Sequence, residues 1–137
     1  MPHFAKGALE ASLPAHGIAY EHMPALGGLR RSLPDSINAG WRNASFRGFA
    51  DYMQDEVFWR ALASLELKAS QRRTAIMCAE ALPWRCHRSL ISDALTVDGV
   101  EVRHITGKAA PARHGITPFA RVVDGRITYP AADRLPV

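Results

Sequence analysis

Both cysteines of the chain lie within one short stretch, MCAEALPWRCHRSL, together with other side chains that can carry out chemistry. Cys78 and Glu80 stand at its start, and Cys86 and His87 follow a loop that contains proline and tryptophan. A thiol beside cationic groups and a helix start can be held as a thiolate, which is its reactive form. A histidine or carboxylate within reach can then accept or return the proton. Cys86 is therefore the candidate nucleophile, and Glu80 or His87 is the candidate acid/base.

The same stretch is suited to binding an anion. A helical pattern follows it, and the first backbone N–H groups of a helix have no partners within that helix. Arg85 and Arg88 can add paired donors to these N–H groups, and Ser89 stands at the same helix start. The sequence therefore predicts an anion-binding site over residues 79–89.

Each of these residues also has a purely structural interpretation, and the residues alone leave both open. Cys78 ends an apolar run, where a cysteine often serves as a small buried core residue. Cys86 can be a buried residue at a helix start, and His87 can bond a neighbouring carbonyl group. Glu80 can form an ion pair with one of the nearby arginines.

A zinc site is the least favoured chemistry for this stretch. The spacing between Cys78 and Cys86 is wider than in the paired cysteine knuckles of structural zinc sites, and no second cysteine pair follows. A full set of ligands would need one of the distant histidines, His22, His104 or His114. We therefore predict no metal, and no cofactor is predicted either.

Hydrophobic spacing predicts the elements that position this stretch. In chain order we expect a helix over 6–16, a strand over 18–24, a loop over 25–48, a helix over 49–70, a strand over 74–79, a helix over 89–99, a strand over 100–106 and a hairpin over 120–130 that turns at Asp124-Gly125. This order is typical of an α/β protein with a largely parallel sheet. Such sheets bind ligands at the carboxyl ends of their strands, and residues 79–88 lie at one such end.

Composition restricts the class of protein. The formal charge is +4, and the 17 basic residues are 14 Arg and 3 Lys. Arginine side chains suit phosphate and carboxylate ligands, although a GC-rich genome would also raise the arginine content. The basic residues form no dense run, so a nonspecific nucleic-acid-binding tail is not predicted. No apolar run approaches the roughly 20 residues of a membrane span, and the first ten residues lack the apolar core of a signal peptide. We expect a single cytoplasmic domain over 1–137 with reduced thiols and no membrane partner.

The stretch MCAEALPWRCHRSLISDAL resembles the signature of the domain-of-unknown-function 488 family, in which CAE ends a strand and CHR opens a helix. The segments IAYEHMPALGGLRR, GFADYMQDEVFWRAL and ITPFARVVDGRITYP resemble other parts of the family, so the resemblance spans essentially the whole chain. It implies a three-layer, Rossmann-like α/β fold with a mostly parallel sheet and helices on both faces. The family has no established biochemical function. The positions that match its motifs are Gly27, Gly28, Arg30, Cys78, Glu80, Cys86, His87 and Arg88.

The chain departs from the family pattern at its start. Members usually begin with a strand like TIGHS, a helix and a strand ending in DVR, and a P-x-F segment follows. Here Pro2-His3-Phe4 resembles that P-x-F segment, so we expect the chain to be N-terminally truncated relative to the family, either because its start codon is assigned too late or because it is a truncated paralogue. Missing central strands would leave sheet edges exposed, and we therefore expect a homodimer that pairs through those edges.

Two functional hypotheses follow. The first is an enzyme acting on a phosphate-bearing or nucleic-acid substrate, in which Gly27, Gly28 and Arg30 close over the helix start. Cys86, His87 and Glu80 would then move protons or attack the substrate. The second is a noncatalytic module that binds a nucleotide or nucleic acid in the same cradle. The sequence does not identify the substrate or the reaction.

Overall fold

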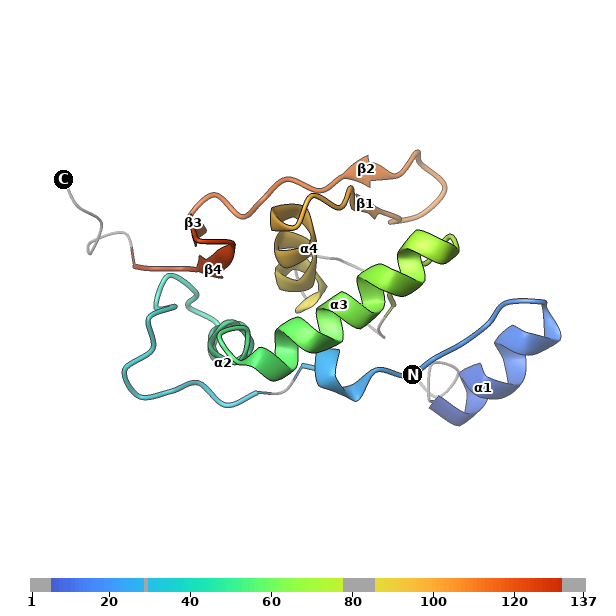
Figure 1. The fold of residues 1–137 in the computed structure, drawn as a ribbon, viewed down its shortest axis with the longest axis horizontal. Coiled ribbons are helices and arrows are strands. Elements are labelled where there is room, and N and C mark those ends of the chain that lie inside the picture. The colour runs from blue at the N-terminus through green and yellow to red at the C-terminus, as the bar shows by residue number, and fades with distance from the viewer. Residues whose placement is uncertain (1–5, 29, 78–85, 132–137) are drawn as a thin grey trace.

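The computed structural model describes residues 6–28, 30–77 and 86–131. These residues form four α-helices, one short 3₁₀ helix and two small antiparallel hairpins (Figure 1). In chain order the elements are α1 (Lys6–Ala15), η2 (Pro24–Leu26), α2 (Ala44–Tyr52), α3 (Glu56–Gln71), α4 (Arg88–Val97), β1 (Arg103–His104), β2 (Ala112–Arg113), β3 (Arg121–Val123) and β4 (Arg126–Thr128).

The first helix stands apart from the other elements. α1 confirms the helix predicted over 6–16, and it includes Pro14 within its last turn. It lies to one side of the other elements and adds no residue to the core cluster (Figure 1). The strand predicted over 18–24 is wrong, because residues 18–23 form no ladder and η2 begins at Pro24. A strand needs a neighbouring edge to satisfy its backbone groups, and the described residues offer none here.

The single helix predicted over 49–70 is in fact two helices. α2 begins earlier, at a cap in which the Asn43 side chain accepts from the N–H groups of Ser45 and Phe46. The chain turns after Tyr52, and Asp55 caps α3 by accepting from the N–H of Val57. An aspartate one position before a helix satisfies an otherwise unpartnered N–H group, so the cap starts a second helix.

The strand predicted over 74–79 is not found in the described residues. Residues 74–77 have no regular structure, Met77 is 49% exposed, and residues 78 and 79 lie outside the described part. The described strands pair only in antiparallel fashion, so the three-layer parallel sheet is not shown. An apolar run forms a buried parallel strand only where strands lie on either side of it. What the structure shows is a mixed α/β chain.

The C-terminal hairpin confirms its prediction. β3 and β4 pair with Val123 opposite Arg126, so Asp124 and Gly125 form the two-residue turn. Both turn residues have positive φ, 52° and 74°, as the tightest hairpin turns require. The second hairpin joins β1 and β2, with Arg103 opposite Arg113 and His104 opposite Ala112.

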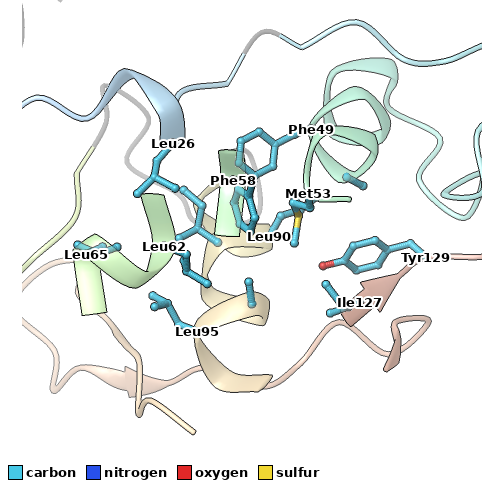
Figure 2. Packing of buried hydrophobic residues seen from close by; sticks show 13 residues of the cluster. Leu26, Phe49, Met53, Phe58, Leu62, Leu65, Leu90, Leu95, Ile127 and Tyr129 are labelled. Carbon is cyan, nitrogen blue, oxygen red and sulfur yellow. The ribbon is translucent and has the colours of Figure 1, made fainter. Parts of the chain in front are cut away.

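The core lies where α2, α3 and α4 meet, and β4 closes one side (Figure 2). Its largest side chains are fully buried: Phe49, Met53, Phe58, Leu62, Leu90, Ile127 and Tyr129. Figure 2 shows the Tyr129 ring entering this cluster from the chain that follows β4. Within the described residues, no helix is long and apolar enough to cross a membrane.

A buried carboxylate holds the loop that precedes α2. Asp51 in α2 accepts hydrogen bonds from the Leu33 N–H at 2.9 Å, the Ser36 hydroxyl at 2.6 Å and the Asn38 amide at 2.8 Å. Asn38 in turn accepts from the backbone N–H of Tyr129 at 2.9 Å. The long loop predicted from sequence is therefore ordered by polar contacts to the core.

Candidate functional site at the start of helix α4

Seven of the predicted site residues lie in the described part of the chain, and two do not. Glu80 and Arg85 are outside it, as is the structural candidate Cys78. The described ones are Gly27, Gly28, Arg30, Cys86, His87, Arg88 and Ser89. They gather around the first turn of α4 and the loop that follows η2.

Cys86 and His87 form a contact pair just before α4 begins. His87 Nε2 lies 3.0 Å from the carbonyl oxygen of Leu26. Because a carbonyl oxygen can only accept, Nε2 carries the proton, and in the neutral ring Nδ1 has the lone pair. Nδ1 lies 3.6 Å from the Cys86 sulfur, so it is placed to accept the thiol proton.

The sulfur of Cys86 also caps the helix. The backbone N–H of Arg88, the first residue of α4, donates to Sγ over 3.4 Å. A helix start carries partial positive charge, which favours a thiolate over a thiol. Cys86 is only 6% exposed, and burial in apolar surroundings acts in the opposite direction. The helix start and His87 therefore oppose burial in setting the thiolate fraction.

The loop after η2 packs directly on His87. A Cβ atom at Gly28 would lie 2.9 Å from His87 Nδ1, so only glycine allows this approach. The Phe49 ring lies 4.9 Å from the imidazole on another side. The structure thus brings Gly28 to the Cys86–His87 pair and fixes the ring from two sides.

Arg30 points its donors at its own loop. Its guanidinium donates to the carbonyl oxygens of Gly27 at 3.3 Å and Pro24 at 3.2 Å. It also lies 3.8 Å from the centre of the Tyr52 ring, a cation–π distance. In this arrangement Arg30 shapes the loop that contacts His87.

The first N–H groups of α4 donate to atoms of the chain itself. Ser89 N–H donates to the Cys86 carbonyl at 3.2 Å, and Leu90 N–H donates to the His87 carbonyl at 3.0 Å. The Ser89 hydroxyl is buried and also reaches the Cys86 carbonyl at 3.2 Å. An anion bound here would compete with the sulfur for the helix start, and the anion site stays a prediction.

One turn further along α4 lies a polar cluster that the sequence did not predict. Asp93 is fully buried, and its carboxylate accepts from His114 Nε2 at 2.7 Å, from the Tyr129 hydroxyl at 2.7 Å, and from Thr117 through both N–H (3.1 Å) and hydroxyl (2.7 Å). His114 Nδ1 lies 2.6 Å from His104 Nε2. Asp93, His114 and His104 therefore form a continuous hydrogen-bonded chain, named here the Asp93 relay.

Burial shifts the pKa values of two side chains at the relay, Tyr129 and His104. Burial raises the pKa of Tyr129 far above its usual value, and the Asp93 charge and hydrogen bond add to that effect. Burial also lowers the pKa of His104, and the nearby His114 and Arg88 lower it further, against the opposing effect of Asp93. Both side chains are therefore held in their neutral forms at neutral pH.

His104 lines a pocket of about 210 Å³. The pocket lies between the end of α3, residues 74–76, α4 and residues 100–105, and its polar walls include Glu66, Arg88 and Ser92. Burial, followed by a hydrogen bond and charge repulsion from Asp98, raises the pKa of Glu66 to about 7. Within the described residues, no three His, Cys, Asp or Glu side chains are arranged to hold a metal ion.

A local signal for the relay was present in the sequence. Asp93 stands on the same helical face as Leu90 and Ala94, both of which are buried. A carboxylate on an apolar helix face is rarely buried without partners, so it predicts donors from elsewhere in the chain. The donors follow from tertiary structure alone. From sequence alone, His104 and His114 are only distant candidates for a zinc ligand.

The family model for "Domain of unknown function DUF488" matches residues 1–95. The chain belongs to this family. The DUF488 match includes the Cys86–His87 pair and Asp93, and it ends before His104, His114 and Tyr129. Searches of curated proteins and of solved structures found no match to this DUF488 chain.

Proposed function

We propose that this DUF488 protein is an enzyme in which Cys86 is the nucleophile and His87 its base, acting on a phosphate-bearing substrate. The observation that carries the proposal is the position of the sulfur, 3.6 Å from His87 Nδ1 and 3.4 Å from the Arg88 N–H. The thiol proton passes to Nδ1, and Nε2–H continues to donate to the Leu26 carbonyl. The resulting thiolate and imidazolium form an ion pair at the helix start.

The remaining predicted residues complete this proposal. Arg85, Arg88 and Ser89 would bind the anionic group of the substrate, and Glu80 would serve as a further acid/base. Gly27, Gly28 and Arg30 form the loop that covers His87. The close approach of Gly28 to the imidazole ring, and the hydrogen bond that orients this ring, support a role for the loop in positioning His87.

The test is the pH profile of alkylation. The full chain is treated with iodoacetamide between about pH 5 and 9, and mass spectrometry follows Cys86 separately from Cys78. We expect Cys86 to react well below pH 8, where an ordinary thiol is mostly protonated. In His87→Gln, the amide can still donate to Leu26 but cannot take the thiol proton, so the profile should move to higher pH.

Two results would contradict the proposal. One is a Cys86 that stays unmodified in the folded chain and reacts only in denaturant. The other is an unchanged pH profile in His87→Gln. The exposed histidine that follows α1 supplies the control, since His16→Gln should leave the profile of Cys86 as in the unmodified chain.

A noncatalytic binding module is the second candidate, and the burial of Cys86 favours it. Such a module would bind a nucleotide or nucleic acid with an affinity that falls steeply as salt rises. The binding should survive Cys86→Ser, because the sulfur would then serve only to cap the helix. Fluorescence anisotropy with a labelled oligonucleotide at two salt concentrations measures this.

Three expectations about the protein's setting belong to the same proposal: a cytoplasmic location, a parallel sheet completed by further strands, and a homodimer joined at exposed strand edges. Val122 and Val123 in β3 are 46% and 58% exposed, which suits an edge that pairs with a second copy. Light scattering of the purified chain measures the oligomeric state directly. A monomer at all concentrations would contradict the dimer.

A further inference from the structure

The hydrogen bonds of the Asp93 relay determine which nitrogen atoms carry protons. The Asp93 carboxylate is surrounded by donors from His114, Thr117 and Tyr129, as an ionised acceptor requires. His114 therefore donates from Nε2, and its Nδ1 accepts from His104 Nε2 at 2.6 Å. This leaves the lone pair of His104 on Nδ1.

The lone pair of His104 has no partner in the described part of the chain, and His104 lines the pocket. The hydrogen-bonded chain from Asp93 through His114 to His104 thus ends at a cavity of about 210 Å³. This volume is below the range of roughly 300–1,000 Å³ that is typical of pockets for drug-sized ligands. A ligand here is therefore a small group.

The charges around the pocket favour an anion. Arg88 and Arg103 are the cations of the wall, and Arg103 lies 3.4 Å from the Glu101 carboxylate. Burial, and after it the neighbouring Asp98, raises the pKa of the Glu66 carboxyl group to about 7, so this wall residue carries less negative charge than an ordinary glutamate. Arg88 faces the same cavity as His104 and acts on it electrostatically.

We propose that this pocket binds a phosphate group, inorganic or as a monoester, and that His104 accepts a proton from its acidic hydroxyl. Arg88 binds the phosphate oxygens, while His114 and Asp93 are positioning residues that keep the His104 lone pair on Nδ1. The pocket shares Arg88 with the proposed thiolate site but requires neither Cys86 nor His87. The two proposals can therefore fail separately.

The proton is conserved along the relay. A phosphate monoanion gives its hydroxyl proton to His104 Nδ1 and becomes a dianion, and His104 becomes an imidazolium. The Nε2 proton of His104 can then cross to His114 Nδ1, which places the positive charge beside the Asp93 carboxylate. Asp93 itself remains ionised, as does the carboxylate in other Asp–His pairs.

Nuclear magnetic resonance of the histidine side chains in the ¹⁵N-labelled full chain tests this inference. We expect both His104 and His114 to carry the proton on Nε2 at neutral pH. Inorganic phosphate should raise the titration midpoint of His104, because the dianion stabilises the imidazolium. Sodium chloride at equal ionic strength is the control and should leave that midpoint unchanged.

Variants separate the ligand contact from the positioning role. His104→Gln should weaken phosphate binding about tenfold, because it removes a hydrogen bond to a charged group. His16→Gln, just after α1, should not change the binding. Asp93→Asn should lower the titration midpoint of His104, since the Asp93 charge raises it. If that variant does not fold, His114→Gln provides the readout: His104 should lose its single tautomer.

The inference is overturned if His104 carries its proton on Nδ1, if phosphate leaves its midpoint unchanged, or if His104→Gln binds phosphate as tightly as the unmodified chain. Alkylation of Cys86 is measured on the same samples. If Cys86 reacts well below pH 8 and phosphate has no effect at His104, this inference alone is removed. If Cys86 does not react in the folded chain and phosphate raises the His104 midpoint, the proposed function alone is removed.

Discussion

The Cys86–His87 pair lies just before α4 and the Asp93 relay is anchored within that helix, yet the chain assembles them differently. Cys86 and His87 are neighbours in sequence, and His87 also reaches the Leu26 carbonyl, 61 positions away. Asp93 collects donors from positions 21, 24 and 36 residues away. The first site is thus made mainly by local chain geometry, and the second exists only in the folded molecule.

The two sites should also contribute differently to the free energy of unfolding. The sulfur contact at 3.6 Å is long, so little folding free energy depends on it. The relay concentrates hydrogen bonds of 2.6–3.1 Å around one buried charge, and losing that charge leaves several donors without an acceptor. The pair should therefore tolerate substitution that the relay does not.

Removing the acceptor of the relay should have the largest effect. Asp93→Ala leaves the buried donors of His114, Thr117 and Tyr129 unsatisfied, at a cost of about 3–5 kcal/mol in the free energy of unfolding. Urea unfolding followed by circular dichroism measures it. Asp35→Ala, at an exposed loop position, is the control and should cost almost nothing.

The same measurement on Cys86→Ala tests the other side of the comparison. We expect a loss of about 1 kcal/mol, because one buried sulfur atom is removed and the helix start opens to water. If Cys86→Ala destabilised the chain as much as Asp93→Ala, the contrast between the two sites would be wrong.

Gly28→Ala should disturb the pair and leave the relay intact. The new methyl group would meet His87 Nδ1 at 2.9 Å, and relieving that contact should cost about 1–3 kcal/mol. The displaced imidazole should also slow alkylation of Cys86 below pH 8. Gly115→Ala is the matched control, because its Cβ meets nothing within 4 Å. Equal stability of the two variants would show that the loop does not press on His87.

Glu66→Gln should have the smallest effect, and it depends on pH. The pKa of Glu66 is about 7 in the folded chain against 4.5 for the free side chain. Between these values the folded state binds more protons, so the free energy of unfolding falls as pH rises. Glu66→Gln has no such loss. Above about pH 7 it should therefore be more stable than the unmodified chain, by at most about 1 kcal/mol because solvent screens the site.

Melting temperatures at about pH 4 and pH 8 check the sign of the Glu66 effect. The two chains should melt together at the lower pH and separate at the higher one. Asp35→Asn, which changes an exposed loop carboxylate, is the control. A constant difference between Glu66→Gln and the unmodified chain at both pH values would contradict the raised pKa.

The sequence predicted the elements whose signals are local. The end of α4 before Gly99 and the turn at Asp124-Gly125 follow from single residues, and both are found. The break between α2 and α3 was missed although Asp55 marks it, because the apolar spacing continues across the cap. The strand predicted at 18–24 is not formed, and the one predicted at 74–79 is not found in its described residues, 74–77, because a strand depends on partners elsewhere in the chain.

The candidate site divides in the same way. Cys86 and His87 could be named from their types and positions, and their contact follows from adjacency. The contact between Gly28 and His87 could not be deduced from spacing, because it depends on how η2 packs beside α3. His104 and His114 stand ten positions apart, and only the β1–β2 pairing brings their rings together.

Tyr129 has a consequence for how the chain folds during synthesis. It is the last residue of the core in sequence, and its N–H reaches Asn38 across 91 positions. The three core helices can form as they are made, but the core closes only once Tyr129 has been added. Contacts this distant in sequence slow folding, so the nascent chain exposes Phe49 and Phe58 until the segment with Tyr129 has been made. The protein is thus expected to depend on chaperones until its final segment is in place.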